Sequence, residues 1–375
     1  MTLKVMTLVG TRPEIIKLSR VIPALDAHTH HILVHSGQNY DYELNEIFFQ
    51  EMEIRKPDFF LDAARPTAAE TIGEVITRID RLLEEVRPEA FLILGDTNSC
   101  LGCIAAKRRH IPVFHMEAGN RCFDDRVPEE VNRRIIDHTS DINMPYSAIA
   151  REYLLREGIA PDRIIKTGSP MFEVLAHYRP RIDASDVLAR LALTAGEYYV
   201  VSAHREENVD SPEKLRRLVE ILNRLASDSG KPIIFSTHPR TRKRLDAVGM
   251  TLHENVQSMK PLGFFDYVHL QKFAATTLSD SGTITEESSI LNFPALNLRE
   301  AHERPEGMEE GAVMMTGLNP ERVFDGLEIL AHQPRGEERL LRPVEDYQMP
   351  NVSEKVLRVV ESYGGYVARK LYGDF

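Results

Sequence analysis

Short apolar runs alternate with longer amphipathic segments along most of the chain, and this alternation predicts strands separated by helices. The expected strands in the first half cover residues 4–9, 31–35, 90–94, 113–116, 142–144 and 164–166. Those in the second half cover residues 199–202, 232–236, 275–279 and 295–298. Because strands joined through helices form parallel sheets, the pattern predicts an α/β fold with two doubly wound Rossmann-like domains and an interdomain cleft.

The length of the chain also favours two domains. Its 375 residues exceed one ordinary core and suit two domains of about 150 to 200 residues each. We place the N-terminal domain at residues 1–170 and the C-terminal domain at 171–351, with a polar, proline-containing stretch at 177–186 near the junction. The last segment, 352–375, predicts one more helix, which we place against the N-terminal domain.

The charge and hydropathy of the chain argue against a nucleic acid or a membrane as its partner. The formal net charge of -11 argues against a nucleic acid or an anionic membrane, because such partners require clustered Lys and Arg. No apolar run approaches the roughly 20 residues of a membrane span, and the start of the chain is too short and interrupted for a signal peptide. We therefore expect a cytoplasmic protein that binds neither nucleic acid nor membrane.

The cysteines are too few for a disulfide framework. Cys100 and Cys103 form a C-x-x-C after the strand 90–94, which is a spacing found in redox pairs. Two small apolar residues on the buried side of a helix give the same pattern, and we prefer that interpretation. No second pair of ligands at a suitable spacing accompanies them, so we predict no metal site. Cys122 lies near two carboxylates and is expected to line their pocket.

Three carboxylates stand where parallel strands end or a helix begins. Asp96 follows the strand 90–94, Glu117 follows the strand 113–116, and Glu129 lies in the first turn of the next predicted helix. Ligands bind at the carboxyl ends of parallel strands, so we expect the three side chains to converge on one site. Clustered carboxylates suit general acid and base catalysis near neutral pH. An aspartate after a glycine is also a common helix cap, which leaves a structural alternative for Asp96.

Basic residues follow the first strand, in the motif G-T-R-P-E at residues 10–14. Proline is favourable at the first position of a helix, so Arg12 is expected at a helix N-terminus with Lys17 about one turn further on. That arrangement suits a phosphate group. An ordinary capped helix with two solvated bases fits the same residues. The motif is not G-x-G-x-x-G, so it does not predict a dinucleotide site.

The second half adds a histidine and a possible nucleotide site. His204 follows the strand 199–202 and is a candidate acid or leaving-group contact, or else a satisfied loop histidine, and His238 is a weaker example of the same pattern. After the strand 275–279, Ser281 and Gly282 would place N–H groups and a hydroxyl at a helix N-terminus. Glu287, one turn further on, can accept hydrogen bonds from a ribose diol, although first-turn acids also occur in ordinary capped helices. Phosphate and ribose recognition together indicate a nucleotide.

These motifs resemble the non-hydrolysing UDP-N-acetylglucosamine 2-epimerases, which have the two-domain fold of the GT-B glycosyltransferases. The resemblance spans nearly the whole chain and rests on seven motifs in order. They are G-T-R-P-E-x-x-K at 10–17, G-D-T at 95–97, E-A-G at 117–119, P-E-E-x-N-R at 128–133, H-R-E at 204–206, D-S-G-x-I-x-E-E at 280–287 and E-R-P-E at 303–306. One such motif would be weak, but seven in order are highly specific.

The resemblance implies roles for particular residues. The positions that match the family's catalytic acids, bases and supporting groups are Asp96, Glu117, Glu129 and His204. The positions that match its UDP-sugar contacts are Arg12, Lys17, Arg133, Ser281, Gly282, Thr283, Glu287 and Arg304. It further implies removal of the proton on carbon 2 while UDP leaves from carbon 1, return of UDP after protonation of the other face, no metal or nicotinamide cofactor, and a homodimer.

Two departures from the family pattern bear on regulation and substrate. The family's usual Thr-Gly-Gln-His-Arg is S-G-Q-N-Y at 36–40, in a region where many bacterial members bind an activating second UDP-sugar. The family's Gly-Leu-Arg becomes Gly119-Asn120-Arg121, followed by an altered loop to Arg126. The variant resembles the capsule and O-antigen branch that converts UDP-2-acetamido-2,6-dideoxy-L-talose to UDP-N-acetyl-L-fucosamine, with conversion of UDP-N-acetylglucosamine to UDP-N-acetylmannosamine as the alternative.

Other classes of protein explain fewer of these residues. A GT-B glycosyltransferase would share the fold and nucleotide site but would have no evident use for four convergent ionisable groups. Tyr366 and Lys370 have the spacing of a short-chain dehydrogenase pair, yet no glycine fingerprint accompanies them. A non-catalytic sugar-nucleotide binding protein would not need Asp96, Glu117 and Glu129 together.

Overall fold

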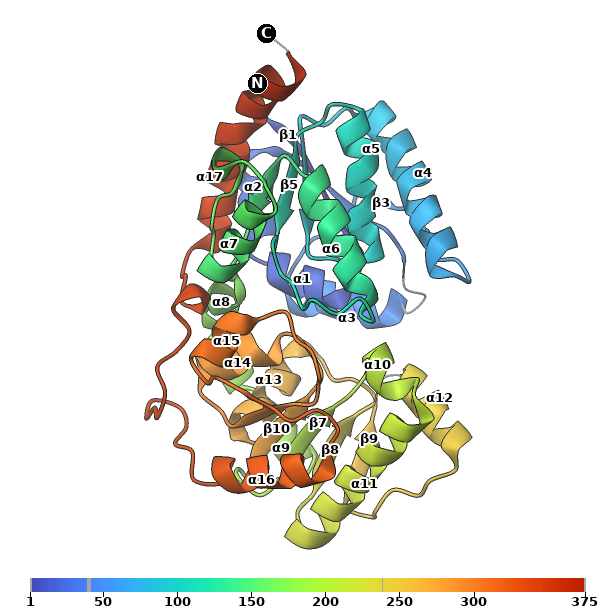
Figure 1. The fold of residues 1–375 in the computed structure, drawn as a ribbon, viewed down its shortest axis with the longest axis vertical. Helices are drawn as coiled ribbons and strands as arrows, with labels where there is room; N and C mark the ends of the chain where they lie inside the picture. The colour runs from blue at the N-terminus through green and yellow to red at the C-terminus, as the bar shows by residue number, and fades with distance from the viewer. Residues whose placement is uncertain (1, 39–41, 238, 374–375) are drawn as a thin grey trace. The chain divides into compact units, whose positions relative to one another are not determined.

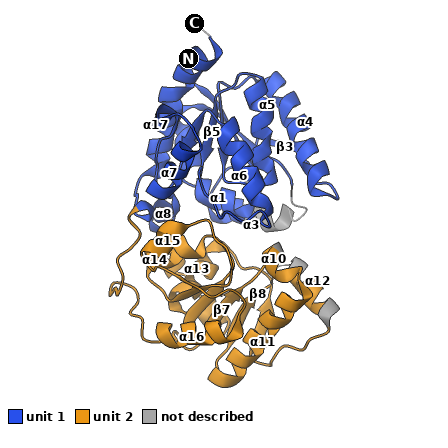
Figure 2. Ribbon diagram, viewed as in Figure 1, with its two compact units in different colours: residues 1–176, 346–375 blue, residues 177–345 orange. Residues whose placement is uncertain are grey.

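The computed structural model describes residues 2–38, 42–237 and 239–373 (Figure 1). The chain forms two compact units (Figure 2): unit 1 comprises residues 1–176 and 346–375, and unit 2 comprises residues 177–345. The sequence analysis placed the corresponding boundaries after residues 170 and 351. No helix in the described part of the chain is long and apolar enough to cross a membrane.

Unit 1 contains a parallel sheet of six strands in the order β3-β2-β1-β4-β5-β6. The strands are β1 (Lys4–Val9), β2 (His30–His35), β3 (Phe59–Phe60), β4 (Ala90–Leu94), β5 (Val113–Met116) and β6 (Ile142–Met144). Thr7 of β1 pairs with Leu33 of β2 on one side and with Leu92 of β4 on the other. The order reverses between β1 and β4, so the carboxyl ends of these strands form the switch point at which doubly wound sheets bind ligands.

Helices of unit 1 cover the sheet and continue beyond it. They are α1 (Arg12–Leu18), α2 (Val21–His28), α3 (Tyr42–Glu51), α4 (Ala68–Val86), η1 (Asn98–Gly102), α5 (Cys103–Arg108), α6 (Pro128–Thr139), α7 (Ala148–Arg156), η2 (Pro161–Arg163), α17 (Val352–Val367) and the π-helical η4 (Ala368–Tyr372). Two further helices, α8 (Met171–Asp183) and η3 (Glu345–Tyr347), cross the boundaries between the units. Helix α4 begins with a capping box between Thr67 and Glu70 and buries Val75 and Ile79 against the sheet. The C-terminal α17 packs against α2 (Figure 1).

Unit 2 repeats the same architecture with a parallel sheet in the order β12-β11-β10-β7-β8-β9. Its strands are β7 (Tyr199–Ser202), β8 (Ile233–Ser236), β9 (Val256–Met259), β10 (Thr276–Ser279), β11 (Ala295–Asn297) and β12 (Met314–Met315). Its helices are α9 (Val187–Arg190), α10 (Glu206–Val209), α11 (Pro212–Ser229), α12 (Pro239–Val248), α13 (Phe264–Phe273), α14 (Ile284–Leu291), α15 (Pro305–Glu309) and α16 (Pro320–Leu330). Leu222 of α11 and Phe235 and Leu278 of the sheet are fully buried in its core. The α/β fold with two doubly wound sheets is therefore confirmed.

One local prediction was wrong. Residues 164–166 form no strand, because only Ile164 makes a bridge to the edge of the sheet, opposite Asn143. The proline-containing stretch 177–186 is mostly helical, since α8 runs through it with Pro180 inside. Proline disrupts a helix only locally. The unit boundary falls between residues 176 and 177 within α8, and the side chains of Val174 and Tyr178, before and after it, are both buried.

Candidate active site

The carboxyl ends of the strands of unit 1 have a strained backbone at the predicted carboxylates. Gly95, which precedes Asp96, has a φ of 81°, and Glu117 has a φ of 64° although it is not a glycine. Left-handed backbone at a non-glycine residue is uncommon and is concentrated at functional sites. Hydrogen bonds to the sheet fix both turns, because the Gly95 N–H donates to the Met116 carbonyl and the Glu117 N–H donates to the Met144 carbonyl. Strand ends thus present Asp96 and Glu117 in defined positions.

Lys17 contacts Glu117 directly. Its Nζ lies 2.5 Å from Glu117 Oε2, and the two side chains are only 4% and 11% exposed. The Asn120 amide donates to the other carboxylate oxygen, Oε1, over 3.3 Å. Lys17 Nζ also lies 5.5 Å from the centre of the Tyr146 ring. The sequence predicted Lys17 as a phosphate contact, whereas in the structure it neutralises a predicted catalytic carboxylate.

Glu14 joins the first motif to the motif that contains Asp96. Its Oε2 accepts hydrogen bonds from the Gly10 and Thr11 N–H groups, each over 2.6 Å, while its Oε1 accepts one from the Thr97 hydroxyl over 2.7 Å. Burial raises the pKa of Glu14 more than these hydrogen bonds lower it. A Cβ at Gly10 would lie 2.0 Å from Ser99 Oγ, so only glycine lets the residue after β1 approach η1 this closely.

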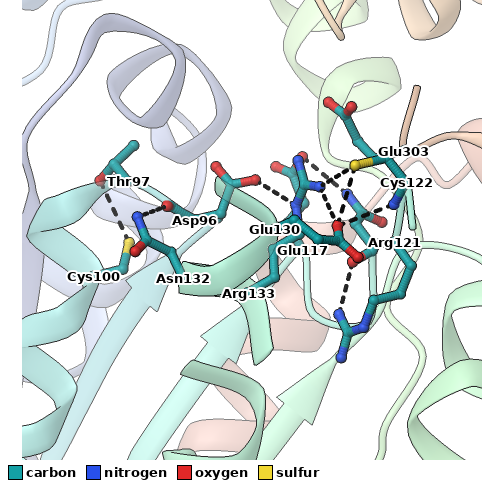
Figure 3. A network of polar contacts seen from close by, with 12 residues as sticks. Asp96, Thr97, Cys100, Glu117, Arg121, Cys122, Glu130, Asn132, Arg133 and Glu303 are labelled. Carbon is teal, nitrogen blue, oxygen red and sulfur yellow. Dashed lines mark hydrogen bonds and ion pairs between the residues drawn. The ribbon is translucent and has the colours of Figure 1, made fainter. Parts of the chain in front are cut away.

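Asp96 is held by Arg133 of α6 (Figure 3). Arg133 Nε donates to Asp96 Oδ2 over 2.7 Å, and Arg133 Nη1 donates to Glu130 Oε2 over 2.9 Å. The Asn132 amide donates to the Asp96 carbonyl over 2.9 Å. Pro128 starts α6, and the helical period places residues 130 and 133 on one face. Arg133, predicted as a substrate contact, is therefore a bridge between two carboxylates.

A buried network of polar side chains supports the segment that follows Glu117. His115 Nδ1 lies 2.9 Å from Asp137 Oδ1, and Arg121 Nη1 lies 2.7 Å from Asp137 Oδ2. Arg121 also forms a two-pronged ion pair with Glu157, over 2.8 and 2.6 Å. Burial alone would raise the pKa of Asp137, but His115 and Arg121 outweigh it and hold that pKa below its usual value. Gly119 fits here because a Cβ would lie 2.4 Å from the Ala150 carbonyl oxygen.

The other predicted residues of unit 1 also lie at the ends of helices. Glu129 is half-buried in the first turn of α6. Arg12 begins α1, with its guanidinium 5.4 Å from the centre of the Phe48 ring. In the altered segment 36–40, Gln38 accepts hydrogen bonds from the N–H and hydroxyl of Ser99, while residues 39 and 40 lie outside the described part of the chain.

In unit 2, Asp280 holds the segment that contains His204. The fully buried carboxylate accepts hydrogen bonds from the N–H groups of His204 and Arg205, and His204 Nδ1 lies 3.1 Å from its Oδ1. Burial would raise the pKa of Asp280, but His204 and Arg205 outweigh it and lower that pKa. The imidazole of His204 is one-third exposed, with a side-chain exposure of 34%. His238 lies outside the described residues.

The predicted nucleotide contacts of unit 2 surround the start of α14. The Ser281 and Thr283 hydroxyls lie 3.0 Å apart. A Cβ at Gly282 would lie 2.7 Å from Glu303 Oε1, so a side chain here would displace the end of the Glu303 side chain. Arg304 is buried and pairs with Glu286 over 2.9 Å. In the same unit, Glu287 Oε2 accepts a hydrogen bond from the Gln271 amide over 2.8 Å.

The C-x-x-C cysteines lie on the buried side of η1 and α5. Cys100 and Cys103 are free and fully buried. Burial raises the pKa of the Cys103 thiol to about 12 and raises that of Cys100 well above its usual value. Reactive thiols require the opposite shift, so the structural interpretation holds. No group of three or more His, Cys, Asp or Glu side chains in the described ranges is arranged to hold a metal ion.

Four carboxylates of these networks were missing from the prediction. Glu14 and Asp280 belong to the motifs at 10–17 and 280–287, each of which also fits an ordinary capped helix. Glu130 lies beside Glu129 in the motif P-E-E-x-N-R, and its spacing of three residues marks it as a partner of Arg133. Asp137 follows Arg133 at the next turn of the same face. The helical period of α6 could have revealed both.

Comparison with known proteins gives a consistent family. The family model described as UDP-N-acetylglucosamine 2-epimerase matches residues 23–361. The chain is similar to a structure titled UDP-N-acetylglucosamine 2-epimerase from Rickettsia bellii, with 51% identity, a TM-score of 0.94 and complete coverage of both chains. It is also similar to the Methanocaldococcus jannaschii UDP-GlcNAc 2-epimerase solved in complex with UDP-GlcNAc and UDP, with 32% identity, a TM-score of 0.89 and coverage of 96% and 100%.

A further relative differs in the sugar that its name states. The UDP-2,3-diacetamido-2,3-dideoxy-D-glucuronate 2-epimerase of Pseudomonas aeruginosa is 32% identical over 86% of this chain and 91% of its own length. The family match extends across both units, and the two six-stranded sheets agree with the solved structures. The chain belongs to the non-hydrolysing UDP-N-acetylglucosamine 2-epimerase family and is an isomerase of that family.

Proposed function

We propose that the protein inverts carbon 2 of a UDP-2-acetamido sugar by eliminating and re-adding UDP. The observation that carries the proposal is the pair of ion pairs at neighbouring strand ends, Lys17 with Glu117 and Arg133 with Asp96. Two fixed carboxylates, each beside a cation, supply groups that can move a proton and tolerate the accompanying change of charge.

The reaction balances without an external reactant. A base removes the proton on carbon 2, the C–H electron pair forms a double bond to carbon 1, and the bond from carbon 1 to the β-phosphate oxygen breaks. UDP keeps that electron pair. A proton is then added to the opposite face of carbon 2, and the phosphate oxygen bonds to carbon 1 again. The net change is inversion at carbon 2.

We assign roles by family resemblance and local geometry. The proposed acid and base groups are Asp96, Glu117, Glu129 and His204. The proposed sugar-nucleotide contacts are Arg12, Lys17 and Arg133 in unit 1 and Ser281, Gly282, Thr283, Glu287 and Arg304 in unit 2. Lys17 and Arg133 already neutralise carboxylates, so they are proposed to set the charge of those groups as well as to contact substrate. No metal or nicotinamide is expected to take part.

For the substrate, we propose UDP-2-acetamido-2,6-dideoxy-L-talose, with UDP-N-acetyl-L-fucosamine as product for a capsule or O-antigen polysaccharide. The altered loop supports this choice, because Asn120 contacts Glu117 where the family usually has leucine. The same loop presents Phe123, which is 66% exposed and meets the Tyr153 ring edge-on. An exposed apolar side chain on this loop suits a sugar whose carbon 6 is a methyl group.

Conversion of UDP-N-acetylglucosamine to UDP-N-acetylmannosamine is the second candidate. The names of the similar proteins favour it, including that of the 51% identical structure. The name of the Pseudomonas aeruginosa relative indicates that substituents away from carbon 2 vary within the family. A homodimer and a cytoplasmic location are expected from the resemblance and the sequence.

Proton NMR of purified protein with each UDP-sugar tests the proposal. We expect a new anomeric signal from the L-talo substrate and a slower conversion of UDP-N-acetylglucosamine, both without added NAD and in the presence of a chelator. Conversion of neither sugar would contradict the proposed reaction. Faster conversion of UDP-N-acetylglucosamine would retain the reaction and replace the substrate.

A further inference from the structure

Glu130 collects five hydrogen-bond donors around one fully buried carboxylate. Oε2 accepts from the Cys122 N–H over 3.1 Å, from the Cys122 thiol over 3.3 Å and from Arg133 Nη1 over 2.9 Å. Oε1 accepts from the Phe123 N–H over 3.3 Å and from Arg134 Nη2 over 3.2 Å. Burial alone would raise the pKa of Glu130, but the hydrogen bonds from Cys122 and Arg133 outweigh burial, so the pKa lies below its usual value. The group is therefore a buried anion with several partners.

One set of these contacts fixes the cation beside Asp96. Arg133 has a side-chain exposure of 3%, and its guanidinium donates Nη1 to Glu130 and Nε to Asp96 (Figure 3). A guanidinium is planar, so a hydrogen bond at Nη1 restricts the direction in which Nε points. Glu130 thereby determines how Arg133 meets Asp96.

The other set fixes the loop that departs from the family pattern. Phe123 has a φ of 53°, an uncommon conformation for a bulky residue. The N–H groups of Cys122 and Phe123 both donate to Glu130, which holds this turn in place. The same loop contains Asn120, which donates to Glu117 Oε1, so the position of the loop affects what surrounds Glu117.

We infer that Glu130 is a positioning residue that couples the 119–126 loop to the Arg133 and Asp96 pair. The inference rests on the proposed function, because it assumes that Asp96 and Glu117 act on the sugar. Glu130 itself is fully buried and contacts backbone and arginine, so it acts through those groups. A misplacement of about 1 Å in such a pair can lower a rate about 10²-fold.

Asp141 provides a matched control. It is a fully buried carboxylate of unit 1 that pairs with Lys107 and accepts the Val113 N–H over 2.9 Å. Val113 is the first residue of β5, so Asp141 lies at the opposite end of the strand from Glu117. A purely structural role for Glu130 would make Glu130→Gln and Asp141→Asn alike.

The experiment measures thermal unfolding, UDP affinity and turnover of full-length Glu130→Gln, Glu130→Asp and Asp141→Asn. We expect each Glu130 variant to lower kcat at least about tenfold while UDP affinity stays within about twofold, and Asp141→Asn to lose stability without loss of kcat. Arg133→Lys is then combined with Glu130→Gln. Because Glu130 and Arg133 act as one unit, this double variant should have nearly the kcat of the slower single variant. In the double variant of Glu130→Gln with Asp141→Asn, the fold-changes in kcat of the two single variants should multiply.

Failure of the proposed reaction and failure of the positioning role of Glu130 give different results. If wild-type protein places no solvent deuterium at carbon 2, the proposed function fails. If wild-type protein does incorporate deuterium but Glu130→Gln turns over at the native rate, the positioning role is wrong. Glu130→Asp takes the place of Glu130→Gln in this test if Glu130→Gln does not fold. Multiplicative effects of Glu130→Gln and Arg133→Lys on kcat would also overturn it.

Discussion

Lys17 and Glu117 form a buried ion pair, with 2.5 Å between Nζ and Oε2, although 100 positions separate them in the chain. The pair joins the first helix of unit 1 to the end of β5, and Asn120 contacts the other oxygen of the same carboxylate. Both oxygens of Glu117 are therefore contacted by side chains of unit 1. This arrangement holds both oxygens of a predicted catalytic carboxylate in place.

Replacing Lys17 with methionine should lower kcat about 10²-fold and change UDP affinity less, because Glu117 loses its neighbouring cation. Removal of one partner from a buried ion pair is also destabilising, so the unfolding temperature should fall. Steady-state kinetics and calorimetry with UDP check both effects. Lys107→Met, which removes the cation beside Asp141, is the control and should retain kcat. A raised KM and weaker UDP binding with native kcat would instead make Lys17 a phosphate contact.

The variants Asp96→Asn, Glu117→Gln and Glu129→Gln should each lower turnover by about 10²-fold or more, since a positioned acid or base contributes about 10² to 10⁴. Their shapes are nearly unchanged, so circular dichroism should show native folding. Glu152→Gln, at a surface ion pair with Arg156, controls for loss of a carboxylate in the same unit. Near-native rates in all three variants would remove catalysis from these strand ends.

Arg12→Ala and Glu287→Gln should weaken UDP binding about tenfold to a hundredfold. A hydrogen bond to a charged group contributes about 1.5 to 3 kcal/mol, which corresponds to this change in affinity. Calorimetry with UDP measures the effect, and Arg224→Ala, on the outer helix α11, is the control. Native affinity in both test variants would show that neither residue contacts the nucleotide.

Replacing Asn120 with leucine, the residue usual in the family, should shift preference toward UDP-N-acetylglucosamine, because the hydrogen bond to Glu117 Oε1 is lost. The ratio of kcat/KM for the L-talo and gluco substrates measures this preference. Asn120→Asp keeps the size but places a second carboxylate beside Glu117, so it should lower kcat for both. An unchanged ratio in Asn120→Leu would exclude Asn120 from substrate selection.

Asp137 should make stability depend on pH in the acid range. His115 and Arg121 outweigh burial and hold its folded-state pKa below the unfolded value of about 3.9. Its contribution is thus fully present above that unfolded pKa and is lost as pH falls through the lower folded pKa. Urea unfolding of wild type and Asp137→Asn from neutral to acid pH checks this, and the variant should show the shallower loss below about pH 4. Parallel curves would contradict the assignment.

The architecture was largely predictable because its signals are local. Ala90–Leu94 is apolar along its length and Val113–Met116 is apolar except at His115, a composition typical of buried parallel strands. The bounds of both strands were confirmed. Strands β3 and β12 have two residues each and lie at the edges of their sheets, while β9 is half polar, so none has such a run. Edge strands need less apolar sequence because one side is unpaired.

The candidate site was predictable in position but not in pairing. Strand ends and glycine motifs marked residues 95–97, 117–119 and 280–287, since those features depend on neighbouring residues. Which cation meets which carboxylate depends on contacts between distant segments, so the pairing of Lys17 with Glu117 was not anticipated.

Turnover in heavy water tests the central claim most directly. Elimination breaks the bond between carbon 2 and hydrogen, and a carboxylate that exchanges its proton with solvent delivers deuterium to the other face. We predict one deuterium at carbon 2 of the product by NMR and mass spectrometry, with some free UDP and unsaturated amino sugar after long incubation. Product that retains its original hydrogen at carbon 2 would contradict the mechanism.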